Sequence, residues 1–173
     1  MKKMTTIIGI DPGLASTGYG LIAVENGRSV HVAHGVVTTA ASLSTAARLA
    51  DLYKKMNALL DQYQPDEASI EDIYFAKNSK TFVAVAQAKG VMLLALAEHG
   101  LAVEEYSPLE IKRAVAGNGR AEKTQVQELV RIILKMKEAP APDHASDALA
   151  AAICHTHQSY LNRIAKKEGQ RGV

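Results

Sequence analysis

Two carboxylates follow short apolar segments that have the composition of buried strands. Asp11 ends the run Ile7-Ile8-Gly9-Ile10, and Glu71 ends Ser69-Ile70. Functional groups collect at the carboxyl ends of strands in open α/β sheets, and a carboxylate beside a buried strand is costly to leave unpaired. Each of the two therefore either forms a salt bridge with a lysine or arginine or belongs to a site that binds a cation.

More residues of metal-binding types begin a helical segment near the C-terminus. His144 and Asp147 are three positions apart, so they share one face of a helix that otherwise buries alanines and a leucine. Asp143 lies four positions before Asp147, but an aspartate at this position is also a preferred helix N-cap. The sequence therefore offers a third carboxylate in Asp147, and a fourth ligand in His144 or Asp143.

Three carboxylates and a histidine fit divalent metal chemistry better than sugar hydrolysis. Paired carboxylates also hydrolyse glycosides, but that chemistry needs a cleft lined with aromatic residues, and this chain has no tryptophan and only 5% aromatic residues. Two ions about 3.5–4 Å apart activate a water and stabilise the leaving oxygen of a phosphodiester. Oxygen ligands favour Mg²⁺ or Mn²⁺, and a histidine moves the preference toward Mn²⁺.

The elements that position these residues predict an α/β fold with a mixed five-stranded sheet flanked by helices. Asn26-Gly27 predicts a two-residue hairpin, and a crossover helix before the fourth strand implies parallel pairing there. The apolar patterns predict strands at 5–11, 19–24, 30–37, 68–71 and 101–106, and helices at 49–63, 80–99, 107–116, 122–137 and from 143. We expect a single domain over 1–173, with a short basic tail from about residue 163.

Composition and charge limit the classes of protein to which this chain can belong. The chain has 173 residues, 47% hydrophobic and 22% charged, which is typical of a globular protein. No apolar run reaches the roughly 20 residues that span a bilayer, and the N-terminus lacks a signal peptide, so we expect a cytoplasmic protein without membrane contact. The net charge of +2 is too small to predict a nucleic-acid partner by itself, although the positive charge is concentrated in the second half. The single Cys154 is expected to be a buried thiol.

Five ordered motifs resemble those of RuvC-type Holliday junction resolvases. They are Gly9-Ile10-Asp11-Pro12-Gly13 with Thr17-Gly18-Tyr19-Gly20, Ile70-Glu71-Asp72-Ile73-Tyr74 with Ala76-Lys77-Asn78, Gln87-Ala88-Lys89-Gly90, Ala121-Glu122-Lys123-Thr124-Gln125-Val126, and Asp147-Ala148-Leu149-Ala150. Together they run from residue 7 to about 157. The resemblance implies a ribonuclease H-like fold, a homodimer, and paired symmetric nicks in opposing strands of a four-way DNA junction during recombination and repair. It also implies handover from the RuvA–RuvB branch-migration complex.

The resemblance further implies a role for each matched residue. Asp11, Glu71 and Asp147 take the family's acidic positions and hold two Mg²⁺ or Mn²⁺ ions. The fourth position is His144, where many members have aspartate and some have histidine. Asp143 remains an alternative, either as a ligand or as a residue that orients the His144 ring.

Two basic segments are candidates for contact with DNA. The resemblance places Tyr74, in place of a more usual phenylalanine, where an aromatic ring stacks on bases near the crossover, and it places Lys112 and Lys123 near the scissile phosphate. Aromatic rings in a basic loop stack on unpaired bases, although core packing of the rings and a solvated lysine face are the structural alternatives. The full set is Tyr74, Phe75, Lys77, Asn78, Lys80, Lys112, Arg113, Arg120 and Lys123.

Three other functions remain open at this level. An actin-like nucleotide binder carries a similar Asp-Gly turn, but such folds usually need two related domains. A junction-binding protein without catalysis is disfavoured by the intact acidic set. A related nuclease that acts on RNA or on other branched DNA would use the same residues.

Overall fold

The computed structural model describes residues 4–73 and 79–169, and the side chains of 4–73 and 81–159. Its sheet has the strand order β3-β2-β1-β4-β5, with antiparallel pairing among the first three strands of the chain and parallel pairing of β1 with β4 and of β4 with β5. The mixed five-stranded sheet is therefore confirmed. The strands are β1 (Thr5–Asp11), β2 (Ser16–Glu25), β3 (Arg28–Thr38), β4 (Glu67–Glu71) and β5 (Val103–Tyr106).

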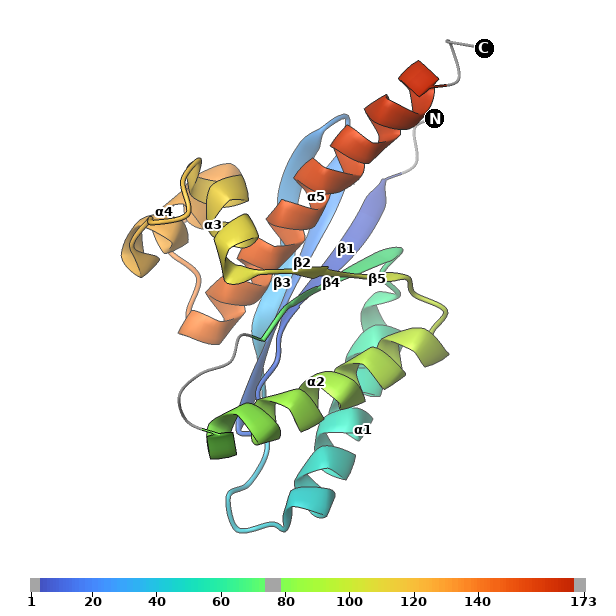
Figure 1. Cartoon of the computed structure of the whole chain (residues 1–173), viewed down its shortest axis with the longest axis vertical. Coiled ribbons are helices and arrows are strands. Elements are labelled where there is room, and N and C mark those ends of the chain that lie inside the picture. The colour runs from blue at the N-terminus through green and yellow to red at the C-terminus, as the bar shows by residue number, and fades with distance from the viewer. Residues whose placement is uncertain (1–3, 74–78, 170–173) are drawn as a thin grey trace.

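Helices cover both faces of this sheet (Figure 1). One apolar core joins the sheet to α1 and α2, and it is built around Ile8, Ile10 and Leu21. The other joins the sheet to α3, α4 and α5, and it contains Ile7 and Ile22. Alternating residues of β1 thus enter opposite cores, as the pleat of a strand requires. The helices are α1 (Thr45–Tyr63), α2 (Ser79–Glu98), α3 (Pro108–Ala116), α4 (Lys123–Ile133) and α5 (Asp143–Gly169).

The α5 helix lies directly on β1 and β2 because glycines leave room for it. A Cβ at Gly9 would come 2.0 Å from the carbonyl oxygen of Ala148, and one at Gly18 would come 1.9 Å from that of His144. Both positions therefore exclude any side chain. This close approach sets the first turn of α5 against the end of β1, where Asp11 lies.

Several predicted boundaries shift in the structure. The hairpin turn is confirmed, with positive φ at Asn26 and Gly27, but β2 begins at Ser16, before the expected residue 19. The α5 helix continues through Gly169, past residue 163, where we expected a loosely held tail.

The predicted helix over 122–137 ends early, at Ile133. Lys135 has a φ of 54°, and the N–H of Met136 donates to the carbonyl of Arg131 over 2.9 Å. This 6→1 bond, with a left-handed residue before it, is a Schellman ending. Lysine occupies the position where glycine is usual, so the sequence did not mark the stop.

The α2 helix carries an exposed apolar side as well as a buried one. Its stretch Thr81–Glu98 has a mean hydropathy of 1.4 and is 28% buried, so by length and composition alone it would qualify as a membrane-spanning helix. Apolar core helices also meet this criterion, and α2 packs on the sheet through residues that include Ala88, Met92 and Leu96. The exposed stripe is formed by Val83, Gln87, Gly90, Leu94 and Ala97.

Candidate metal centre

Asp11 and Glu71 are neighbours at the carboxyl ends of two parallel strands. Ile10 of β1 is paired with Ile70 of β4, so the residue after each isoleucine occupies the adjacent row of the sheet. Both isoleucines enter the core under α1 and α2, and the strand pleat therefore turns Asp11 and Glu71 to the α5 face. The predicted adjacency of these two strands is confirmed.

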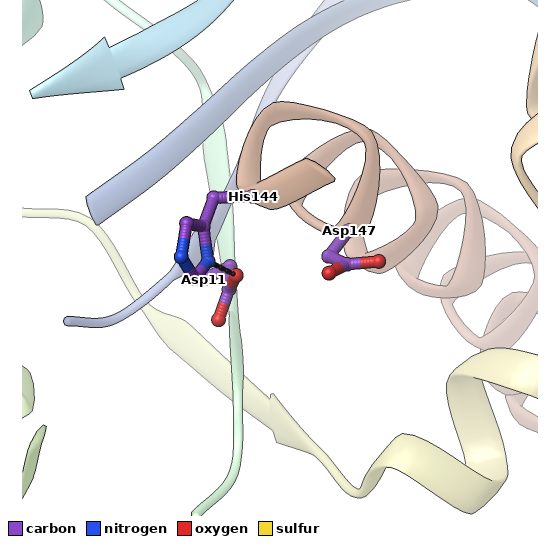
Figure 2. A group of neighbouring side chains, drawn as sticks. All are labelled: Asp11, His144 and Asp147. Carbon is purple, nitrogen blue, oxygen red and sulfur yellow. Dashed lines mark hydrogen bonds and ion pairs between the residues drawn. The ribbon is translucent and has the colours of Figure 1, made fainter. Parts of the chain in front are cut away.

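The first turn of α5 brings His144 and Asp147 to the same place. The Nδ1 atom of His144 lies 2.6 Å from Oδ2 of Asp11. One ligand atom from each of Asp11, His144 and Asp147 lies within 4.8 Å of the others (Figure 2). Asp11 lies 133 residues before His144 in the sequence, yet the spacing of the three side chains suits a shared cation.

The electrostatics of this site favour a bound cation. The pKa of Glu71 is raised to about 8, chiefly by burial and then by the nearby negative charges of Asp11 and Asp147 and a hydrogen bond with Asp11, while the positive charge of Lys123 opposes the rise. Burial also raises the pKa of Asp11, although the His144 contact opposes that rise. Carboxyls that resist ionisation in the free protein become good ligands once a divalent ion supplies the missing positive charge.

Glu71 is not one of the three side chains whose ligand atoms lie within 4.8 Å of one another, but it interacts electrostatically with two of them, Asp11 and Asp147. Its donor atom is an oxygen, like those of the two aspartates, and the histidine adds one nitrogen. This donor set fits Mg²⁺ or Mn²⁺, and the raised pKa of Glu71 is the structural observation that supports the fit.

Lys123 supplies positive charge at the same site. Its ammonium donates to Oδ2 of Asp147 over 3.0 Å and lies 3.3 Å from Oδ2 of Asp143. Asp143 also accepts a 3.0 Å hydrogen bond from the side-chain amide of Gln127. Asp143 thus contacts α4, whereas His144 contacts Asp11. The part played by Gln127 has no signal in the sequence, because its role depends on how α4 packs beside α5.

A pocket of about 180 Å³ opens beside the carboxylates. Its lining includes the carboxylates of Glu71 and Asp147 and the ammonium groups of Lys112 and Lys123. The pocket thus combines negative and positive groups, as a site for a metal-bound phosphate would. Arg113 and Arg120 are exposed on the neighbouring 113–120 segment and do not line this pocket.

The other predicted DNA contacts fall elsewhere in the chain. Tyr74, Phe75, Lys77 and Asn78 lie outside the described residues, and Lys80 belongs to α2 with its side chain outside the described set. Cys154 is buried as expected, and burial raises its pKa to about 12.

Comparison with known proteins decides the family. The model of the family described as crossover junction endodeoxyribonuclease RuvC matches residues 7–155. The chain belongs to this family. A relative of that name from Syntrophomonas wolfei is 47% identical over 95% of this chain and 98% of its own length. Another, from Treponema denticola, is 52% identical over 85% of this chain and 83% of its own length.

Solved structures agree with this RuvC assignment. Thermus thermophilus RuvC has a TM-score of 0.84 at 32% identity, covering 91% of this chain and 97% of that one. The structure described as T. thermophilus RuvC in complex with Holliday junction substrate has a TM-score of 0.82 at 29% identity, covering 91% and 96%. Yeast mitochondrial resolvase Ydc2, at 12% identity with a TM-score of 0.75, supports the fold alone. The expected ribonuclease H-like fold is confirmed.

Proposed function

We propose that this RuvC-family chain cuts four-way DNA junctions by metal-dependent hydrolysis of the phosphodiester backbone. The observation that carries the proposal is the convergence of Asp11, His144 and Asp147 within 4.8 Å of one another. The buried carboxyl of Glu71 beside them completes an acidic site of the kind that two divalent ions need. Family membership narrows the substrate from any phosphodiester to a junction.

In this proposal Asp11, Glu71, His144 and Asp147 are the catalytic residues and hold Mg²⁺ or Mn²⁺. Two ions held by these residues would supply activation of a water and stabilisation of the leaving oxygen. His144 is favoured over Asp143 as the fourth ligand because its Nδ1 atom already lies 2.6 Å from Asp11. Asp143 instead holds the ammonium of Lys123.

The lysines of the pocket are proposed to bind the scissile phosphate. Lys112 and Lys123 line the same pocket as Glu71 and Asp147, so a phosphate between them would meet positive charge on one side and metal-bound carboxylates on the other. With Asp147 holding a metal ion, the Lys123 ammonium, which now donates to Asp147, would be available to a phosphate oxygen. The remaining proposed DNA contacts are Tyr74, Phe75, Lys77, Asn78, Lys80, Arg113 and Arg120.

A homodimer is the proposed working form. A four-way junction has near two-fold symmetry, and a two-fold dimer presents two identical sites to it. The exposed stripe of α2 supports this, because Val83 and Leu94 are 52% and 53% exposed and lie on one helix face with Gly90 between them. Ala88 of the same helix is not part of this surface, because it is fully buried in the core.

The dimer surface is testable separately from catalysis. We expect Leu94→Glu to convert the dimer to monomers in sedimentation velocity, because a charge in the middle of an apolar interface is left unpaired. Ile132→Glu on α4 is the matched control, since Ile132 is 54% exposed and lies away from α2. Loss of the dimer in both variants, or in neither, contradicts this interface.

The cellular setting is proposed from the family alone. We propose a single domain over 1–173 that works in the cytoplasm and receives junctions from a RuvA–RuvB complex. Co-sedimentation of the chain with that complex on junction DNA tests this step.

The decisive assay uses a synthetic four-way junction with Mn²⁺ or Mg²⁺. We expect symmetric nicks that leave ligatable ends, and little cutting of a linear duplex. Asp11→Asn should keep junction binding and abolish cleavage, because it removes a ligand charge without changing the shape of the side chain. The control Asp51→Asn alters an exposed carboxylate on α1 that pairs with Lys55, and it should cut like the parent. Cleavage by Asp11→Asn, or equal cutting of duplex, would refute the proposal.

A further inference from the structure

Lys89 is buried between two carboxylates on the side of the sheet opposite the metal centre. It is the one lysine buried among the described side chains, at 8% exposure. Its ammonium lies 2.5 Å from Oδ1 of Asp72 and 2.5 Å from Oε2 of Glu105. Lysines are almost never buried unless they are paired, so this ion triad of Asp72, Lys89 and Glu105 calls for an explanation.

The carboxylates of the triad come from the two strand ends that border Glu71. Asp72 is the next residue after Glu71, and its N–H donates to the carbonyl of Tyr106 over 2.8 Å. Glu105 precedes Tyr106, which is paired with Glu71 across the parallel strands. Because side chains alternate along a strand, Glu71 faces α5, while the next residue, Asp72 of the triad, faces α2. The metal centre and the ion triad are therefore attached to opposite faces of the same short backbone segment.

We propose that Lys89 is a positioning residue for Glu71. The Lys89 ammonium attaches the ends of β4 and β5 to α2 and so fixes where the β4 backbone presents the Glu71 carboxyl. This inference rests on the metal centre proposed above. Without the ammonium, Asp72 and Glu105 would repel each other across the ends of these strands, and the last residue of β4 would lose its fixed orientation.

The charges of the triad support this role. Burial acts to lower the pKa of Lys89, but its hydrogen bonds to Asp72 and Glu105 outweigh burial and raise it. The ammonium therefore stays charged in the pH range where the enzyme would work. A permanent internal cation can hold two backbone segments at a fixed distance, which a neutral side chain of the same length cannot.

The test compares Lys89→Met with Lys89→Arg in the full chain. Calorimetric titration with Mn²⁺ in the absence of DNA reports the metal centre directly, and a junction assay under single-turnover conditions reports cleavage. Residues that orient metal ligands typically change affinity by about 10–100-fold, and we expect Lys89→Met to weaken Mn²⁺ binding by about tenfold, the lower end of this range. Lys89→Arg should recover most of the affinity because it restores the charge. Junction binding in Ca²⁺ should stay at the parent level in both variants.

Two further variants keep the test decisive. Lys55→Met removes a lysine of an exposed ion pair on α1 and should leave Mn²⁺ affinity unchanged. Glu105→Gln neutralises one of the two carboxylates of the triad and should weaken Mn²⁺ binding, but by less than the roughly tenfold loss expected for Lys89→Met. It can be assayed even if Lys89→Met proves too unstable. Parent-level Mn²⁺ affinity in Glu105→Gln, or in folded Lys89→Met protein, would overturn the positioning role. Failure of the parent chain to cut junctions would refute the proposed function, yet the Mn²⁺ titrations would still test this inference.

Discussion

Replacing Glu71 with glutamine should stabilise the metal-free protein while destroying its activity. In the folded chain the pKa of this carboxyl is raised to about 8, first by burial and then by the charges of Asp11 and Asp147. Glutamine has almost the same shape and imitates the protonated carboxyl. The substitution therefore removes the cost of ionising Glu71 in a buried acidic site, at the expense of a metal ligand.

The sign and size of the effect follow from the two states of the carboxyl. In the unfolded chain Glu71 ionises near its ordinary value of 4.5, whereas in the folded chain it holds its proton until about pH 8. Folded protein thus binds more protons than unfolded protein between these values, and stability falls as the pH rises through this window. At about 1.4 kcal/mol per pH unit, the loss of folding stability caused by Glu71 reaches at most about 3 kcal/mol at neutral pH.

Because Glu71 and Asp11 interact and titrate together, we expect the gain to lie below this upper limit, at about 2 kcal/mol at neutral pH. For a chain of this size, that corresponds to a rise in melting temperature of about 4–8 °C. At about pH 5 the difference between the two proteins should fall below about 1 kcal/mol, since this pH lies only slightly above the value of 4.5 at which the unfolded carboxyl ionises.

The assay is thermal unfolding of parent and Glu71→Gln in the presence of a chelator, at about pH 5, 7 and 8. Adding Mn²⁺ should stabilise the parent strongly and the variant weakly, because only the parent keeps the full ligand set. Glu25→Gln, at an exposed carboxyl at the end of β2, is the control and should show neither effect. A variant no more stable than the parent at pH 8, or a gain equal at pH 5 and pH 8, would refute the electrostatic account of this site.

Three other outcomes follow from the same geometry. His144→Ala should slow single-turnover cleavage more than Asp143→Ala, because the histidine contacts Asp11 and Asp143 contacts Lys123; the reverse order would make Asp143 the fourth ligand. Lys123→Met should slow cleavage by about 10²-fold, the effect typical of losing one donor that stabilises a transition state. Its calorimetric Mn²⁺ affinity should be at least that of the parent, because the Lys123 ammonium competes with the metal for Asp147; weaker Mn²⁺ binding would contradict this competition. Gly9→Ala should lower the free energy of unfolding in urea by at least about 3 kcal/mol, because its Cβ would overlap the α5 backbone; a parent-like urea midpoint would contradict that packing.

The sequence by itself determined the local elements and the chemical types of the site. Apolar periodicity predicted all five strands and five helices, and Asn26-Gly27 predicted the hairpin. Asp11 and Glu71 were recognisable because each ends a short apolar strand. These features depend on residues near one another in the chain, so local patterns suffice to find them.

Boundaries that depend on unusual backbone geometry were harder to predict. The α4 helix ends in a Schellman motif with Lys135 at a positive φ, where glycine would have marked the stop. The α5 helix, which packs on β1 and β2, also continues to Gly169, past the predicted start of the basic tail.

The tertiary structure alone decided which charges meet. His144 reaches Asp11 because glycines in β1 and β2 let α5 lie on the sheet without intervening side chains. The raised pKa of Glu71 arises from burial and from the aspartates brought beside it, neither of which a sequence spacing records. Lys89 likewise gains its proposed role from the strand ends that meet it. Sequence specifies the ligand types, but distance and dielectric surroundings exist only once the long-range packing has formed.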